Sequence, residues 1–94
     1  MNVHWTSEAI LNVDAAVGIG SEMARELYES TNQLVSFPHS GRKVPEVDNP
    51  AIRELIHKKY RIVYEIRGEQ VSVLTVFHSS RDFGNTSFGR RSNQ

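Results

Sequence analysis

Two segments of alternating apolar pattern, separated by a short turn, constrain the fold of this chain most strongly. Residues 60–66 and 71–78 carry apolar side chains at nearly every second position, which is the period of a β-strand. Gly68 and Glu69 lie between them and are typical of a tight hairpin turn. Residues 52–57 show the same period. The sequence therefore predicts three antiparallel strands joined in chain order.

Two helices are expected in the first half of the chain. Apolar residues between Ala9 and Val17 recur at helical spacing after a candidate N-cap at Thr6. A second apolar stripe begins after Ser21, which is also a good N-cap. This helix should end near residue 36, because the residue before Pro38 is biased away from the helical conformation.

These elements predict an α+β fold in which an N-terminal helical hairpin packs on one face of a small antiparallel β-sheet. Residues 3–5 predict a further short strand, and residues 37–50 a long loop that contains all three prolines. Residues 1–83 should form a single domain, and residues 84–94 a flexible polar tail. Since a domain of this size builds about one fully buried layer, we expect the second sheet face to be open.

Charge is unevenly divided along the chain, although the formal net charge is zero. Residues 1–50 contain three Lys or Arg and seven Asp or Glu, a net charge of −4. Residues 51–94 contain eight Lys or Arg and four Asp or Glu, a net charge of +4. The second half is the better candidate for contact with nucleic acid or an acidic protein, although small domains also show such imbalance by chance.

Several classes of protein are disfavoured by what the sequence lacks. There is no cysteine, so disulfides and thiolate metal sites are excluded. The four histidines are scattered without metal-ligand spacing, and we predict neither a metal nor a cofactor. The N-terminal residues do not resemble a signal peptide, and no segment reaches the roughly 18 apolar residues of a membrane span. We expect a cytoplasmic protein with no membrane partner.

Arg61 stands among apolar residues of the predicted hairpin and is the starting point for function. Because the apolar face of residues 60–66 should lie beneath the helices, Arg61 is expected to project from the opposite, open face. The second strand returns to the end at which the first strand begins. We therefore expect one cationic patch formed by Lys58, Lys59, Arg61, His78 and Arg81.

Such a patch is suited to an anion, since arginine carries a donor fork that matches phosphate. Cleavage of RNA would further need a proton acceptor, for which His78 and Glu46 are the candidates. The alternative is that the two arginines form ordinary surface ion pairs. Their candidate partners are Glu54, Glu65 and Asp82.

Three short motifs occur in a recognisable order along the chain. They are Phe37-Pro38-x-x-Gly41-Arg42, Ile52-Arg53-Glu54-Leu55 and Tyr60-Arg61-Ile62-Val63-Tyr64. Together with their surroundings, from Trp5 to Phe83, they resemble the RelE/ParE superfamily of toxins from type II toxin–antitoxin modules. The resemblance implies the α+β fold and a cognate antitoxin in a toxin–antitoxin hetero-oligomer. The antitoxin should lie along the helical hairpin and reach the sheet.

This superfamily contains two kinds of member. RelE-like members are ribosome-dependent endoribonucleases that cleave mRNA, and their cationic residues correspond to Arg61 and Arg81, and loosely to Lys58 and Lys59. ParE-like members inhibit DNA gyrase, and many end in a Phe-His-x-x-x-Asp pattern that residues 77–82 match. For a nuclease, the catalytic candidates are Arg61 and Arg81, which the resemblance implies, and His78 or Glu46, which could move the proton.

Two departures from the RelE-like pattern favour a gyrase inhibitor. RelE-like nucleases usually carry a tyrosine or histidine near the C-terminus, whereas Phe83 and Phe88 here can stack on a base but cannot transfer a proton. The neutral net charge also provides little attraction to ribosomal RNA. The alternatives are the ribosome-dependent nuclease and a member that binds its antitoxin without toxicity. The predicted target-binding residues are Lys58, Lys59, Arg61, Arg81 and Phe83.

Overall fold

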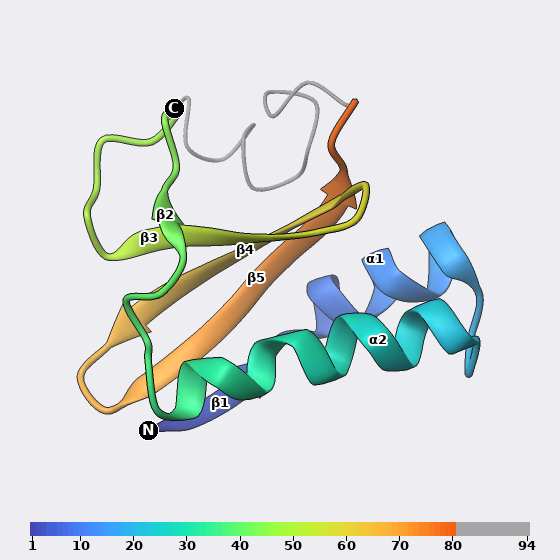
Figure 1. Cartoon of the computed structure of the whole chain (residues 1–94), viewed down its shortest axis with the longest axis horizontal. Helices are drawn as coiled ribbons and strands as arrows, with labels where there is room; N and C mark the ends of the chain where they lie inside the picture. Colours follow the sequence, from blue (N-terminus) through green and yellow to red (C-terminus); the bar gives the residue numbers. More distant parts are fainter. Residues whose placement is uncertain (81–94) are drawn as a thin grey trace.

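The computed structural model describes residues 1–80 and shows two helices against one face of a mixed β-sheet (Figure 1). The elements are β1 (Asn2–Trp5), α1 (Ser7–Val17), α2 (Glu22–Ser30), the 3₁₀ helix η1 (Thr31–Val35), β2 (Arg42–Lys43), β3 (Ile52–His57), β4 (Tyr60–Arg67) and β5 (Gln70–His78). The strand order is β1-β5-β4-β3-β2. The predicted α+β class and the three central strands are confirmed.

The sheet differs from the prediction at its two edges. The short N-terminal strand β1 pairs parallel to β5, so the sheet is mixed rather than purely antiparallel. The two-residue strand β2, which pairs antiparallel with β3, lies in the segment predicted to be a loop.

In the part of the chain that the structure describes, no helix has the length and apolar character needed to cross a membrane.

Both helices begin where the sequence predicts. The hydroxyl of Thr6 accepts a hydrogen bond from the backbone N–H of Ala9 at 3.2 Å, and Ser21 caps α2 in the same way. The second helix is shorter than predicted, because the chain tightens to a 3₁₀ helix after Ser30. The Thr31 hydroxyl donates to the carbonyl of Tyr28 at 2.8 Å, a local bond that competes with regular helical geometry.

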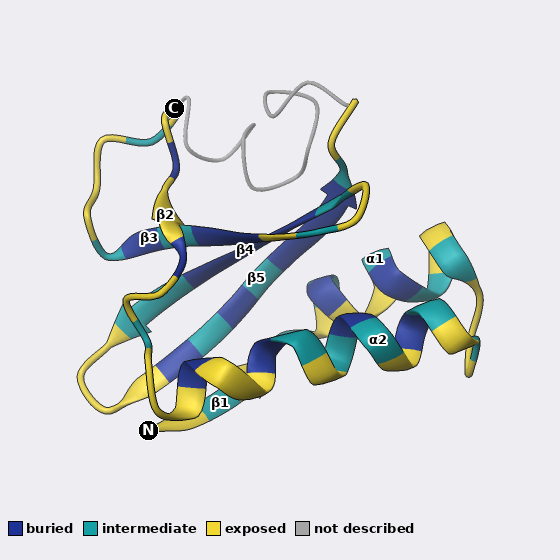
Figure 2. Ribbon diagram, in the orientation of Figure 1, coloured by how far each residue is buried: buried dark blue, intermediate teal, exposed yellow. Residues whose placement is uncertain are grey.

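The larger core lies between the helices and the sheet, and the buried stripes of both helices face it (Figure 2). It contains Ala9, Val13, Ala24, Leu27, Leu34, Leu55, Ile62, Tyr64, Val71, Val73 and Val76. The apolar face of β4 therefore packs beneath the helices, as its alternation predicts. We call this the helix side of the sheet.

The opposite face is not open as predicted, since the segment between β2 and β3 folds over it. Val44, Ile52, Val63 and Phe77 form a second buried cluster there, and Val47 and Leu74 pack against it. We call this the loop side of the sheet. A domain of this size thus buries part of both sheet faces, because the irregular segment 44–51 supplies the second cover.

A β-bulge at Leu74 interrupts the pairing of β4 and β5. Val73, before the bulge, lies in the helix-side core, and so does Val76 after it, whereas Phe77 lies on the loop side. The predicted alternation placed Val73 and Phe77 on one face and is wrong beyond the bulge, because one extra residue shifts the two-residue period.

The close surroundings of Gly41 explain why the first motif has a glycine at this position. A Cβ at this position would lie 2.5 Å from the hydroxyl oxygen of Tyr64 and 2.6 Å from the carbonyl oxygen of Glu54. The Gly41 N–H donates to the Tyr64 hydroxyl at 3.0 Å, and that hydroxyl donates to the Pro38 carbonyl at 2.7 Å. A helix-side tyrosine thus fixes the start of the loop that covers the other face.

Candidate functional site

Arg61 lies near the start of β4 on the loop side, the predicted face, but it is not exposed. Only 10% of its side chain is accessible to solvent. Its Nε donates to Oε1 of Glu54 at 2.6 Å, and its Nη1 and Nη2 donate to the two carboxylate oxygens of Glu46 at 3.2 and 3.1 Å. The guanidinium also lies 5.0 Å from the ring centre of Phe77. Arg61 is thus bound on both edges by carboxylates.

Glu54 is the centre of this arrangement, since its side chain is completely buried on β3. Its second oxygen, Oε2, accepts a hydrogen bond from Nε of Arg42 on β2 at 2.6 Å. A buried carboxylate is costly unless it is paired and hydrogen-bonded, and two arginines meet that need here. We call Arg42, Glu46, Glu54 and Arg61 the loop-side ion cluster; its formal net charge is zero.

The cluster changes the acid–base properties of its members. The hydrogen bonds from Arg61 hold the pKa of Glu46 below its ordinary value. Burial lowers the pKa of Arg61, but the hydrogen bonds to Glu46 and Glu54 raise it by more, so the net shift is upward. Glu46 is therefore a weaker proton acceptor than an ordinary glutamate, which argues against its predicted role as a general base.

His78, the other candidate base, lies away from Arg61. Its ring packs edge-to-face against Tyr60 at 5.5 Å, and it lines a depression beside α1 with Asn12 and Ala16. Its Nδ1 accepts a hydrogen bond from the backbone N–H of Ser80 at 3.1 Å. Strand alternation places His78 on the face of β5 opposite to Phe77, whereas the Arg61 guanidinium lies over the Phe77 ring.

Lys58 and Lys59 form the turn between β3 and β4. Lys58 has φ of 55°, a conformation that favours glycine, and its Nζ lies 2.9 Å from Oε1 of Glu26 on α2. Nε2 of His57 lies 3.0 Å from the same oxygen, and both contacts lower the pKa of Glu26. Among residues 1–80, Lys59 is exposed and makes no side-chain ion pair.

The structure therefore does not bring the predicted patch together as a single surface. Lys58 is paired with α2, Arg61 is buried on the loop side, and His78 lies beside α1. Arg81 and Phe83, like the predicted tail, fall outside the described residues. The alternative of an ion pair between Arg61 and Glu54 is the correct one for this arginine, although the pair is buried rather than on the surface.

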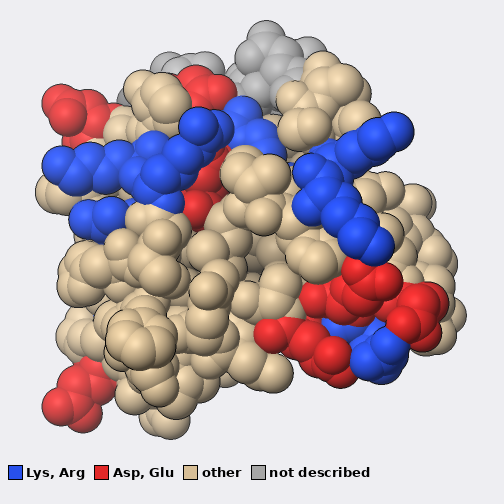
Figure 3. All heavy atoms as spheres, viewed as in Figure 1, with Lys and Arg blue, Asp and Glu red and all other residues tan. Residues whose placement is uncertain are grey.

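Basic side chains are exposed over β2 and β3, at the end of the sheet opposite to the β3–β4 turn, and also beside that turn (Figure 3). Arg42 and Lys43 on β2 pair in register with Glu54 and Arg53 on β3. Acidic side chains of α2 form a separate group below the β3–β4 turn in the same view. Since Arg42 and Lys43 belong to the half of the chain with net negative charge, the charge asymmetry of the sequence does not predict this basic surface.

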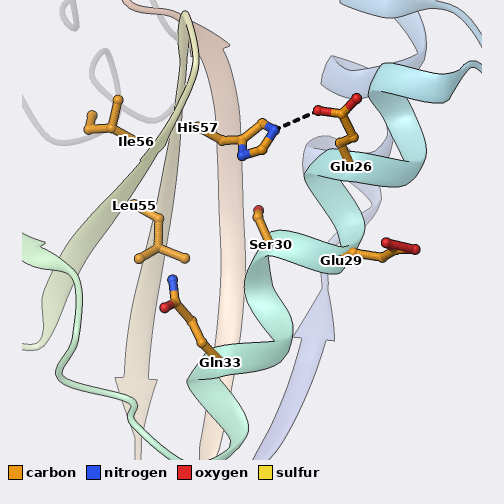
Figure 4. A pocket seen from close by; sticks show the side chains of 7 residues that line it. All are labelled: Glu26, Glu29, Ser30, Gln33, Leu55, Ile56 and His57. Carbon is orange, nitrogen blue, oxygen red and sulfur yellow. Dashed lines mark hydrogen bonds and ion pairs between the residues drawn. The ribbon is translucent and has the colours of Figure 1, made fainter.

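A groove of about 440 Å³ lies between α2 and β3. Its walls are formed by Glu26, Glu29, Ser30, Gln33, Leu55, Ile56 and His57. Leu55 and His57 point toward α2, and Ile56 points away from it and is half-exposed (Figure 4). Because β2 pairs only with Arg53 and Glu54, no strand among the described elements covers the outer edge of β3 at residues 55–57.

Sequence reasoning missed two features of these sites. The contact of Glu26 with His57 and Lys58 joins a helix to a turn 31 residues later, and no local pattern predicts it. The role of Arg42 depends on the unpredicted strand β2. A weak signal existed for Glu54, since strand alternation places it on the side of β3 away from the helix-facing Leu55.

Comparison with known proteins identifies the class to which this fold and these sites belong. A family model described as the ParE toxin of the type II toxin–antitoxin system parDE matches residues 3–83. This match covers most of the chain. The protein therefore belongs to the ParE toxin family and is the toxin component of a type II toxin–antitoxin system.

Solved structures show the same fold. The chromosomal ParDE toxin–antitoxin system from P. aeruginosa has a chain 23% identical to this one, with a TM-score of 0.60; the match covers 83% of this chain and 95% of that one. The E. coli RelBE complex gives 19% identity, a TM-score of 0.66 and coverages of 85% and 98%. The RelBE2 complex from Mycobacterium tuberculosis has a chain 20% identical to this one, with a TM-score of 0.65; the match covers 82% of this chain and 95% of that one. Comparison with curated proteins gives no match.

Proposed function

We propose that this toxin arrests growth as a non-catalytic protein inhibitor of DNA gyrase. The observation that carries the proposal is the state of Arg61, whose guanidinium is already bound by Glu46 and Glu54. A nuclease needs a cation that is free to stabilise the charge on the phosphate in the transition state. The match to a ParE family model supports the same choice.

The arrangement of the candidate catalytic groups also supports an inhibitor rather than a nuclease. A general base must lie within hydrogen-bond reach of the proton that it removes, and the cation must reach the same phosphate. His78 and Arg61 lie on different sides of the sheet, and the lowered pKa of Glu46 makes it a weak base. The ribosome-dependent endoribonuclease with Arg61, Arg81, His78 and Glu46 as catalytic residues is therefore the second candidate.

The β3–β4 turn is the part of the described chain best placed to contact gyrase. Lys59 is exposed there, and its carbonyl accepts a hydrogen bond of 2.7 Å from the N–H of Ser79, which follows β5. The turn and the segment that leads to Arg81 and Phe83 thus lie side by side. We keep Lys58, Lys59, Arg61, Arg81 and Phe83 as the proposed target-binding residues.

The groove between α2 and β3 is the proposed docking site for the cognate antitoxin. An exposed strand edge offers unpaired backbone groups, and such an edge accepts an extended segment of a partner. Leu55 provides an apolar wall beside that edge, and the helical hairpin forms the other wall. A segment that follows α2 and pairs with β3 would meet both the hairpin and the sheet in one toxin–antitoxin complex.

Titration of purified toxin into a gyrase supercoiling reaction tests the function. We expect supercoiling to fall at about stoichiometric toxin, and Lys59→Ala to weaken inhibition roughly three- to tenfold. Lys43→Ala removes the same charge from exposed β2 and is the matched control, for which we expect unchanged inhibition. Normal supercoiling at stoichiometric excess would contradict the proposal.

A parallel translation reaction with ribosomes and mRNA separates the remaining alternatives. Cleavage of mRNA at the ribosomal A site, together with normal supercoiling, would establish the nuclease. If supercoiling is not inhibited, mRNA is not cleaved, and cells grow normally when the toxin is expressed without its antitoxin, the protein would be a member that has lost toxicity.

A further inference from the structure

The sheet contains two turns with similar backbone geometry but different residues. In the β3–β4 turn and in the β4–β5 turn, two residues join strands that are paired up to the turn. The first residue of each turn has φ of 55°; it is Gly68 in the β4–β5 turn and Lys58 in the β3–β4 turn. Glycine adopts this conformation without strain, whereas a residue with a Cβ does so at a cost. The lysine of the β3–β4 turn therefore needs an explanation that its local sequence does not provide.

The two turns differ in what lies beside them. A Cβ added to Gly68 would meet no atom within 4 Å among the described residues. Lys58 instead reaches α2, where its Nζ lies 2.9 Å from Oε1 of Glu26. Nε2 of His57, the last residue of β3, lies 3.0 Å from the same oxygen. One carboxylate of α2 thus holds both the end of β3 and the first residue of the turn.

The contact with Glu26 and the left-handed conformation of Lys58 depend on each other. The direction in which a side chain leaves the backbone changes with φ, so a turn that relaxes to negative φ would carry Nζ away from α2. The cost of a strained residue with a Cβ and the contribution of a partly exposed ion pair are of the same order. Loss of the carboxylate should therefore shift the balance between the two turn conformations measurably.

The conformation of Lys58 also determines where the rest of the turn lies. Lys59 follows it directly, and its side chain is exposed. The Lys59 carbonyl accepts a hydrogen bond of 2.7 Å from the N–H of Ser79, the first residue after β5. Relaxation at Lys58 would move Lys59 and weaken this bond. Glu26 thus acts on Lys59 and Ser79 through Lys58.

We infer that Glu26 is a positioning residue, which holds the β3–β4 turn through Lys58 in the conformation that presents Lys59. The inference rests on the proposed contact of this turn with gyrase for its functional meaning. It adds a residue of α2 to the groups on which inhibition depends. Glu26 also lines the groove between α2 and β3, so one carboxylate belongs both to the support of the turn and to the proposed antitoxin site.

Hydrogen exchange of the Ser79 backbone N–H, measured by NMR on the toxin alone, tests the positioning role. We expect exchange in Glu26→Gln to be roughly three- to tenfold faster than in the wild-type protein, because the variant keeps the size of the side chain but loses the charge that binds Lys58. Glu22→Gln is the matched control, since Glu22 lies one turn earlier on α2 and is paired with the exposed Arg25. It removes the same charge and should leave the exchange rate unchanged. Equal rates in the two variants would overturn the inference.

A rescue variant separates this role from a general loss of stability. In the Glu26→Gln background, Lys58→Gly should restore the wild-type exchange rate at Ser79, since glycine adopts φ of 55° without help from the carboxylate. A general loosening of α2 would not be repaired by a change in the turn. Continued fast exchange in the folded double variant would therefore contradict the positioning role.

The supercoiling assay then separates this inference from the proposed function. If exchange responds as expected, Glu26→Gln should also inhibit gyrase roughly three- to tenfold less than Glu22→Gln, as expected for Lys59→Ala. If exchange responds but the two variants inhibit equally, Glu26 still positions the turn, and the proposed contact between the turn and gyrase is the part that fails.

Discussion

The two sides of the sheet are covered in different ways. On the helix side, the apolar side chains of α1, α2 and η1 pack against the strands. On the loop side, an irregular segment covers a smaller apolar cluster beside four charged residues. Apolar packing is non-directional and depends mainly on area and fit. The ion cluster depends on a few directed contacts, and its central contact pairs the buried carboxylate of Glu54 with the buried guanidinium of Arg61. The helix side therefore provides the scaffold of the fold, and the loop side is the face on which one substitution can change function.

Among the substitutions that test this difference between the two sides, Glu54→Gln should lower the free energy of unfolding the most. Glu54→Gln leaves Arg61 buried without its fixed counterion, so we expect the free energy of unfolding to fall by about 3–5 kcal/mol. Chemical denaturation at neutral pH measures it, with Glu65→Gln as the control, for which a change within about 0.5 kcal/mol is expected. A loss below about 1 kcal/mol in Glu54→Gln would mean that the cluster contributes little to the loop side.

A cavity in the helix-side core should lower the free energy of unfolding nearly as much, but it should leave the loop side unchanged. Leu27 is fully buried, and Leu27→Ala should lower the free energy of unfolding by about 3 kcal/mol through lost burial and the cavity that remains. Because its contacts are apolar, the backbone amide shifts of Val44 and Val47 on the loop side should stay unchanged. Large shifts there would show that the two sides are not independent.

The smallest expected effect is the pH dependence of the Glu46 contact. Arg61 holds the pKa of Glu46 below its ordinary value in the folded protein, so the contact stabilises the fold above that ordinary value and is lost as pH falls through the folded pKa. The half-exposed carboxylate should contribute at most about 1 kcal/mol. Thermal unfolding of wild type and Glu46→Gln should differ at pH 7 and converge as the pH falls below the folded-state pKa of Glu46; a constant difference would contradict this.

The helix side could be predicted well from the sequence, because its elements follow regular periods. The caps at Thr6 and Ser21 and the apolar face of β4 come from local patterns that tertiary structure does not override. The bulge at Leu74 could not be predicted, since a single extra residue in a strand leaves no mark in an otherwise alternating pattern.

The candidate site was predicted only in part, for a different physical reason. The position of Arg61 on the face away from the helices follows from strand alternation. Its burial does not, because it depends on the path of residues 44–51, which have no period. The contact with Glu46 is set by that path alone, whereas the contact with Glu54 could be proposed as one of several ion pairs.

The central claim is that the charge of Arg61 is sequestered in the free toxin, and nitrogen-15 NMR of its guanidinium tests it most directly. Hydrogen bonds to Glu46 and Glu54 should give separate Nη signals with hindered rotation and an Nε–H that exchanges slowly with water at neutral pH. A single averaged Nη signal and rapid exchange, as for an arginine in water, would contradict both the sequestration of Arg61 in the ion cluster and the argument against a nuclease.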